Sequence, residues 1–197
     1  MNEKQVIGVL TYSGDGFSKN TAKIMEEKGY VHVYTGNGKG KTTAALGLAL
    51  RATGAGKKVF IAQYAKGMHY SELDSIAKYL PDIKLKQYGL GCFIFNAPKQ
   101  ADIDAANLGL REVEAIVSGS EYDVIILDEA NIAIFYNLFN AEDLIKVLNK
   151  RNPTTEIVIT GRYVCEEIQE YADLITEMTE IKHYYKQGVQ ARVGIEK

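Results

Sequence analysis

A glycine-rich segment over residues 35–43 carries the residue types that bind phosphate. Its sequence, Thr-Gly-Asn-Gly-Lys-Gly-Lys-Thr-Thr, follows the pattern G-x-x-x-x-G-K-[ST] except at Thr35, which stands where the first glycine is usual. Glycines let backbone N–H groups approach an anion closely, and Lys41 adds a positive charge. We predict a phosphate-binding loop, in which Lys41 is solvated and unpaired until a nucleotide binds. The alternative is a glycine turn without a ligand.

A second group of chemically useful residues follows the apolar run 124–127, which ends in Asp128 and Glu129. A buried strand that delivers carboxylates at its end is typical of a site that holds Mg²⁺ on oxygen ligands, directly or through water. Because successive strand residues face opposite ways, we expect only one of the two acids to point at the metal. The alternative is a strand that ends in two solvated acids.

Arg162 and the pair Phe93 and Phe95 are further candidates. Arg162 follows a predicted strand in a Thr-Gly-Arg turn, where its guanidinium could hold phosphate oxygens; otherwise it is a surface arginine. Phe93 and Phe95 are two residues apart, so on a strand they share one face and form either core or the wall of a site for a large flat ligand. The histidines show no metal-ligand spacing, and no Ser-His-Asp or Cys-His arrangement can be assigned.

The elements that must position these residues alternate between strands and helices. Apolar runs predict strands over residues 30–34, 59–64, 84–88, 122–127, 157–160 and 174–178. Helical signals predict helices over residues 44–52, from Ser71 to a stop at Pro81, and over residues 101–117, 132–138, 140–150 and 165–171. An extended tail is predicted over 188–197. We therefore predict an α/β fold, P-loop NTPase-like, with a mainly parallel sheet and helices on both faces. Ligands of such sheets bind at the carboxyl ends of the strands.

Length and composition bound the function. The 197 residues suffice for one well-buried domain, which we place at residues 30–197, with residues 1–29 as an N-terminal segment that acts as a lid or an edge element. A net charge of −2 gives no general attraction to nucleic acid or to an acidic membrane. The apolar run 6–10 is too short for a membrane span, and two distant cysteines suit a reduced compartment, so we expect a cytoplasmic protein.

Several segments taken together resemble the P-loop ATP:corrinoid adenosyltransferases. That family also carries threonine at the head of its glycine loop, and its further motifs match in order from about Glu26 to the C-terminus. The matching segments are residues 63–67 (Gln-Tyr-Ala-Lys-Gly), 127–129 (Leu-Asp-Glu), 159–162 (Ile-Thr-Gly-Arg), 182–183 (Lys-His) and 188–196 (Gly-Val-x-Ala-x-x-Gly-Ile-Glu). Phe93 and Phe95 stand where the family has a Phe-x-Trp pair.

The resemblance implies a reaction in which the cobalt(I) of a reduced corrinoid attacks the 5′ carbon of ATP and releases triphosphate. It implies catalytic roles for Lys41, Glu129 and Arg162, corrinoid contacts by Phe93, Phe95 and Tyr64, and Mg²⁺ or Mn²⁺ held by Thr42, Glu129 and Asp128. The implied ATP-binding residues are Gly36, Asn37, Gly38, Lys39, Gly40, Lys41, Thr42, Thr43 and Arg51.

The resemblance also implies partners. It implies a homodimer, in which the N-terminal segment covers the site of the other subunit, and an electron-donating flavoprotein as a reductant of cobalt. Neither nucleic acid nor a membrane is expected as a partner. Two other classes remain open from the residues alone: a generic P-loop ATPase or kinase, which releases ADP, and a nucleotide-binding regulatory module without turnover. Identifying the product formed from ATP separates all three.

Overall fold

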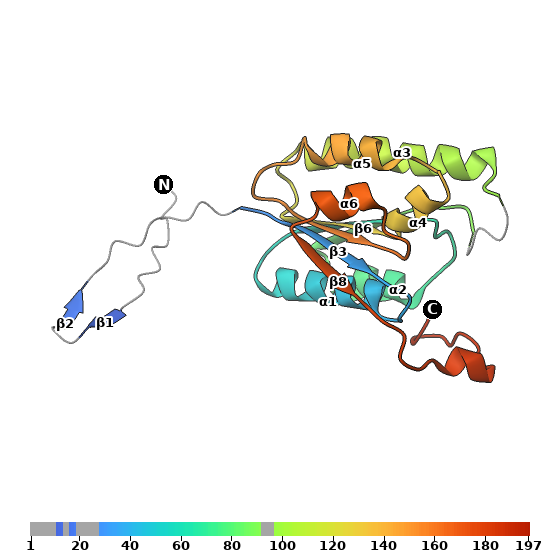
Figure 1. Ribbon diagram of the computed structural model, residues 1–197, viewed down its shortest axis with the longest axis horizontal. Coiled ribbons are helices and arrows are strands. Elements are labelled where there is room, and N and C mark those ends of the chain that lie inside the picture. Colours follow the sequence, from blue (N-terminus) through green and yellow to red (C-terminus); the bar gives the residue numbers. More distant parts are fainter. Residues whose placement is uncertain (1–10, 14–15, 19–27, 92–96) are drawn as a thin grey trace.

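The computed structural model describes residues 11–13, 16–18, 28–91 and 97–197. Its centre is a six-stranded parallel sheet with the strand order β5-β4-β6-β7-β3-β8 (Figure 1). The strands are β3 (Val31–Thr35), β4 (Val59–Tyr64), β5 (Ile83–Tyr88), β6 (Val124–Asp128), β7 (Glu156–Thr160) and β8 (Leu174–Glu177). Near the N-terminus, β1 (Thr11–Ser13) pairs with β2 (Gly16–Ser18) in an antiparallel ladder.

Helices cover both faces of this sheet (Figure 1). One face carries α1 (Lys41–Gly54) and α2 (Ser71–Tyr79), and the other carries α3 (Gln100–Val117), α4 (Ala130–Phe135), α5 (Ala141–Leu148) and α6 (Glu166–Tyr171). The core is accordingly divided into two hydrophobic clusters, one on each face. The predicted α/β class with a parallel sheet and helices on both faces is confirmed.

The central strands β4 and β6 are apolar apart from Gln63 and Asp128, because both of their faces are buried. Every residue of β4 and β6 is buried, as expected for parallel strands between two helical layers. The last strand in the order, β8, is exposed along its whole length and forms one edge of the sheet. The helix predicted over residues 140–150 is present as α5. Asn140 caps its start with a side-chain oxygen that accepts a 2.7 Å hydrogen bond from the backbone N–H of Asp143.

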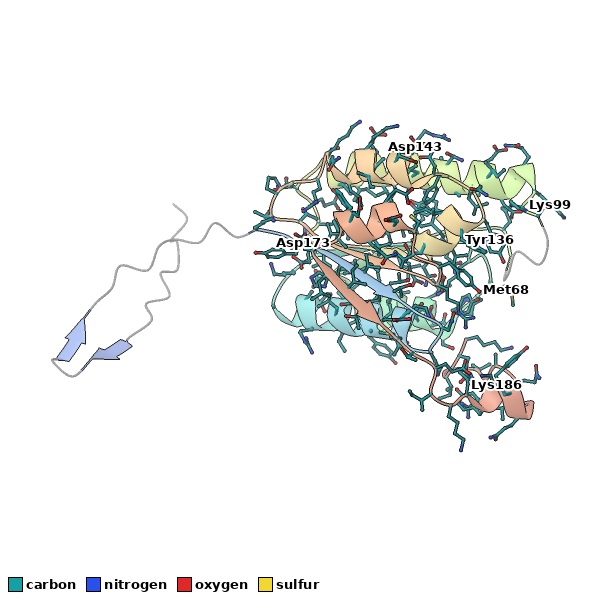
Figure 2. All side chains as sticks on the ribbon, in the orientation of Figure 1. Met68, Lys99, Tyr136, Asp143, Asp173 and Lys186 are labelled. Carbon is teal, nitrogen blue, oxygen red and sulfur yellow. The ribbon has the colours of Figure 1, made fainter. Side chains whose placement is uncertain are left out.

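The carboxyl ends of the strands meet at one edge, and this edge organises the site. In Figure 2, Met68, which follows β4, and Tyr136, which follows α4, lie toward one end of the sheet, whereas Asp173, just before β8, lies at the other. The C-terminal segment departs from the prediction of an extended tail. It forms the 3₁₀ helix η1 (Tyr184–Gln187) and then turns back on itself, because the N–H groups of residues 195–197 bond to the carbonyl oxygen of Arg192. No helix in the described part of the chain is long and apolar enough to cross a membrane.

Candidate active site

The glycine-rich loop connects the end of β3 to the start of α1, as the sequence predicts. The loop packs against the chain that leaves β8: the N–H of Gly38 donates a 2.6 Å hydrogen bond to the carbonyl oxygen of Met178. A Cβ at Gly36 or at Gly38 would lie 2.5 or 2.7 Å from that same oxygen. These glycines are therefore required by a close backbone approach as well as by access to a ligand.

Lys41, the first residue of α1, is held by the loop itself. Its ammonium group donates hydrogen bonds of 2.7 and 2.8 Å to the carbonyl oxygens of Gly36 and Gly38, and the side chain is buried. The prediction of a solvated, unpaired lysine is therefore wrong. Burial, and to a smaller extent the nearby Arg162, lower the pKa of Lys41. The carboxylates of Glu129 and Asp128 partly offset this decrease. The loop thus presents its cation already oriented.

Asp128, at the end of β6, is the centre of a buried polar cluster. Its Oδ1 accepts hydrogen bonds from the hydroxyls of Thr42 at 2.9 Å and Thr160 at 2.7 Å. Its Oδ2 accepts from the ammonium of Lys66 at 2.7 Å and from the amide of Gln63 at 3.3 Å. The Asp128 side chain is 1% exposed and that of Lys66 is 12% exposed. Both carboxylate oxygens are thus occupied by four donors from three different parts of the chain.

Glu129 behaves differently from its neighbour. It has left the strand, with a left-handed backbone at φ 60°, and its N–H donates a 3.0 Å hydrogen bond to the Thr160 hydroxyl. Its side chain lines the pocket in front of the loop. Burial and then the charge of Asp128 raise the pKa of Glu129, while Lys66, Lys41 and Arg162 lower it. The two acids therefore face different surroundings, and Glu129 is the one that lines the pocket.

The pocket has a volume of about 820 Å³ and lies between the loop, the carboxyl ends of the strands and the C-terminal segment. Its size is that of a typical small-molecule site. Its charged lining consists of the cations Lys39, Lys41, Lys66 and Arg162 and the acids Glu72, Glu129 and Glu196, with His183 nearby and the C-terminal Lys197 at one wall. The concentration of cations beside the loop suits a polyphosphate.

The C-terminal segment closes one side of this pocket. The ammonium of Lys39, in the loop, lies 3.3 Å from a carboxylate oxygen of Glu196 and donates a 3.1 Å hydrogen bond to the carbonyl oxygen of Ile195. Glu196 also accepts hydrogen bonds from the Tyr184 hydroxyl and from Arg192, and these two partners hold the pKa of Glu196 below its ordinary range. A ligand on the loop would therefore lie beneath the tail.

The structure brings together most of the predicted site residues. Those that line the pocket are Gly38, Lys39, Gly40, Lys41, Thr42, Thr43, Glu129 and Arg162. Asp128 lies directly behind this wall, and Gly36 contributes the carbonyl oxygen that holds Lys41. Asn37 is exposed on the loop but does not line the pocket.

Three predicted contacts need a different account. Tyr64 is fully buried against Tyr88 and Phe139, so it is a core residue. The prediction that it contacts a corrinoid is therefore wrong. Arg51 is exposed in the last turn of α1, roughly 15 Å along the helix from Lys41 at about 1.5 Å per residue, and it does not line the pocket. Phe93 and Phe95 lie outside the described residues.

Two functional features escaped prediction. Lys66 stands in the segment 63–67 that carries the family resemblance, yet no role followed from its position; only the fold shows that it pairs with Asp128, 62 residues away. The tail was expected to be extended, although its glutamate and arginine four residues apart, Arg192 and Glu196, are spaced as an ion pair on a helical turn. The contact between Lys66 and Asp128 is not encoded by local periodicity, whereas the spacing of Arg192 and Glu196 is a local signal that could have indicated a turn.

The residues fit a divalent cation of the Mg²⁺ type. Mg²⁺ binds through one or two protein oxygens and completes its shell with phosphate oxygens and water. The pocket offers this set in the Thr42 hydroxyl and the Glu129 carboxylate, with Asp128 bonded to Thr42 from behind. The described residues hold no cluster of three or more histidine, cysteine or acidic side chains that would form an all-protein metal cage.

Comparison with known families decides the identity of this site. Residues 27–196 match the model of one family, described as ATP:corrinoid adenosyltransferase BtuR/CobO/CobP. The chain belongs to this family. The match includes the glycine loop, Lys66, both acids, Arg162 and most of the tail, so all of the pocket lining described above except Lys197 falls within the region matched by the family model.

Individual relatives agree with the family assignment. The chain is similar to a corrinoid adenosyltransferase of Escherichia coli, at 33% identity over 89% of each chain, and to corrinoid adenosyltransferase CobA of Salmonella typhimurium, at 32% identity over 92% of each. Among solved structures, the flagellar accessory protein FlaH of Methanocaldococcus jannaschii superposes with a TM-score of 0.55 at 18% identity, over 77% of this chain and 71% of FlaH. The likeness to FlaH concerns the fold alone.

Proposed function

We propose that this site transfers the 5′-deoxyadenosyl group of ATP to the cobalt(I) of a corrinoid and releases inorganic triphosphate. The observation that carries the proposal is the family match over residues 27–196, which includes all of the pocket lining except Lys197. In this reaction a cobalt–carbon bond forms at C5′, the bond from C5′ to the phosphate oxygen breaks, and triphosphate leaves with that electron pair. Cobalt(I) supplies the nucleophile, so no side chain has to form a covalent intermediate.

The task left to the protein is to orient ATP and to stabilise the triphosphate as negative charge grows on it. The free N–H groups at the start of α1, Lys41 and Arg162 lie on one wall of the pocket and are suited to this charge. Because Lys41 is already fixed by two loop carbonyls, little reorganisation is needed when the nucleotide binds. This arrangement supports a phosphate chain that lies along the loop.

For the metal, we propose that Mg²⁺, or Mn²⁺ in its place, is held by Thr42 and Glu129 together with phosphate oxygens. Asp128 then acts from behind, because both of its oxygens are engaged by protein donors. The metal would neutralise part of the triphosphate charge. Asp128 fixes the Thr42 hydroxyl, and Thr160 joins the two acids through its own hydroxyl.

The proposal extends to assembly and setting. A homodimer is supported by the uncovered edge strand β8, on which Leu174 and Ile175 are both exposed. We propose that residues 1–29 cover the site of the partner subunit. An electron-donating flavoprotein is proposed to reduce cobalt to cobalt(I), and the cytoplasm is proposed as the location of the protein. The mass of the protein in solution, measured by light scattering, tests the dimer.

The activity is tested by incubating the protein with ATP, Mg²⁺ and chemically reduced cobalamin under anaerobic conditions in dim light. We expect the absorption spectrum of adenosylcobalamin to appear, and we expect no ATP to be consumed when the corrinoid is omitted. Steady release of ADP and phosphate without corrinoid would instead support an ATPase or a kinase. ATP binding without any turnover would support a regulatory module.

A further inference from the structure

Two large aromatic side chains, Phe135 and Tyr163, lie against each other beside the active-site pocket. Their ring centroids are 4.3 Å apart and the rings are inclined by 31°. Phe135 is the last residue of α4 and Tyr163 follows the end of β7, so the pair joins two separate elements. Despite this contact the residues are 50% and 51% exposed. The pair therefore forms a preassembled apolar surface that still faces water.

The backbone at Tyr163 indicates that this placement is specified. Its φ is 58°, in the left-handed region that a bulky side chain rarely adopts. Among the described residues, four non-glycine residues have a positive φ, and three of them, Ala65, Glu129 and Tyr163, line the pocket. Such conformations persist where neighbouring structure enforces them, and they concentrate at functional sites. Here Asn131 of α4 donates a 3.2 Å hydrogen bond to the carbonyl oxygen of Gly161, which anchors the turn.

The position of the pair suits contact with the corrinoid, the second substrate, rather than with the phosphates of ATP. Tyr163 lines the pocket next to Arg162, together with Ile132 and Tyr136 of the adjoining α4 region. The pocket volume of about 820 Å³ is typical for one ligand of moderate size. A corrinoid is larger than ATP, and its cobalt must reach C5′ while the macrocycle extends beyond the mouth of the pocket. The exposed apolar surface begins in the pocket lining with Tyr163 and continues to Phe135, outside that lining, so the face of such a ring can cover it.

We propose that Phe135 and Tyr163 form an aromatic platform on which one face of the corrin macrocycle packs during adenosyl transfer. This inference rests on the proposed function, since it assigns a subsite for the corrinoid within that reaction. Stacking between flat conjugated rings and the exclusion of water from two half-exposed aromatics supply the attraction. The fixed contact between the two rings keeps the platform rigid, so little conformational freedom is lost when the ligand arrives.

The test separates the ring of Tyr163 from its backbone. Tyr163→Asn removes the ring but keeps a residue that tolerates a positive φ, and Tyr163→Phe keeps the ring. Phe135→Ala removes the other half of the platform. Tyr79→Ala serves as the matched control, because Tyr79 is exposed at the end of α2 and does not line the pocket. Binding of hydroxocobalamin is measured by equilibrium dialysis in the presence of ATP, and binding of ATP alone by calorimetry.

We expect Tyr163→Asn and Phe135→Ala each to raise the Kd for hydroxocobalamin about tenfold, with the Kd for ATP and the melting temperature little changed. Tyr163→Phe and Tyr79→Ala should bind like the wild type. If the wild type and the variants bind hydroxocobalamin equally well, the platform proposal is overturned while the proposed function stands. A loss of ATP affinity instead would assign the pair to adenine, and a change in subunit mass would assign it to a subunit contact; both outcomes overturn the inference. A wild type that binds ATP but no corrinoid overturns the proposed function as well.

Discussion

Two acidic residues contact the glycine loop and the start of α1 through different partners, Asp128 through Thr42 and Glu196 through Lys39, and their surroundings differ. Asp128 is buried behind the loop, where Thr42, Thr160, Lys66 and Gln63 saturate its oxygens. Glu196 lies in the tail and lines the pocket; its side chain is 16% exposed, and that of its partner Lys39 is 41% exposed. A charge pair deep in the protein resists rearrangement, whereas a pair with one exposed partner contributes less and is screened by salt.

This difference assigns separate tasks to the two clusters. The Asp128 cluster is a fixed support that orients the groups in contact with the nucleotide. The Glu196 cluster is a contact that can be broken at low cost, which suits a wall that must move when substrates enter and triphosphate leaves. The predictions below remove one cluster at a time.

The largest expected effect is on stability, at the buried cluster. Asp128→Asn leaves the ammonium of Lys66 without its charge partner in a position that is 12% exposed, so we expect a loss of about 3–5 kcal/mol in the free energy of unfolding. Urea denaturation measures this loss. The double variant Asp128→Asn with Lys66→Met removes both charges and should recover a large part of it. If the double variant is no more stable than the single one, the two residues are not coupled.

Lys41→Met should have the largest effect on the rate of adenosylation. Loss of one oriented cationic donor to the triphosphate typically costs about 10²–10³ in rate, or roughly 3–4 kcal/mol. Methionine retains the apolar stem, so the remaining structural loss is that of two hydrogen bonds to Gly36 and Gly38, at about 1 kcal/mol each. The rate and the melting temperature are measured on the same preparation. A variant with normal activity would exclude the phosphate role.

The two neighbouring acids should separate activity from stability. Glu129→Gln is expected to weaken Mg²⁺-dependent activity by about 10-fold or more with little change in the free energy of unfolding, because Glu129 lines the pocket. Asp128→Asn, assayed at a temperature at which it is fully folded, should reduce activity less. The measurement is the rate as a function of Mg²⁺ concentration. A greater loss of activity in folded Asp128→Asn would reverse the assignment of the metal ligand.

The smallest effect is expected at the tail. Glu196→Gln removes the charge that Lys39 and Arg192 face, so we expect little change in the melting temperature. Because the tail lines the pocket, we expect a change of a few-fold in the KM for ATP with the rate at saturation nearly unchanged. The comparison is repeated at high salt, where wild type and variant should converge. A marked fall in the melting temperature would show that the tail is as integral to the fold as the Asp128 cluster.

The sequence predicts the features that local patterns encode. The apolar runs before Asp128 and Arg162 predict strands whose carboxyl ends meet, and the structure places Arg162 in the lining of the pocket and Asp128 directly behind it. What escaped prediction depends on contacts between distant segments. Burial of Lys41 follows from two loop carbonyls, the partner of Lys66 lies 62 residues away, and the path of the tail depends on Lys39. Local periodicity carries no information about such pairings.

The most direct test of the central claim is the fate of the two ends of ATP in a single turnover. ATP labelled in the adenosine group and, separately, at the α- and γ-phosphates is mixed with an excess of enzyme, Mg²⁺ and cob(I)alamin. If the site performs adenosyl transfer, the adenosine label moves to the corrinoid, and the α- and γ-phosphate labels leave together in one triphosphate. If the γ-phosphate separates from the α-phosphate before any adenosylated corrinoid forms, the enzyme cleaves a phosphoanhydride bond and the account is wrong.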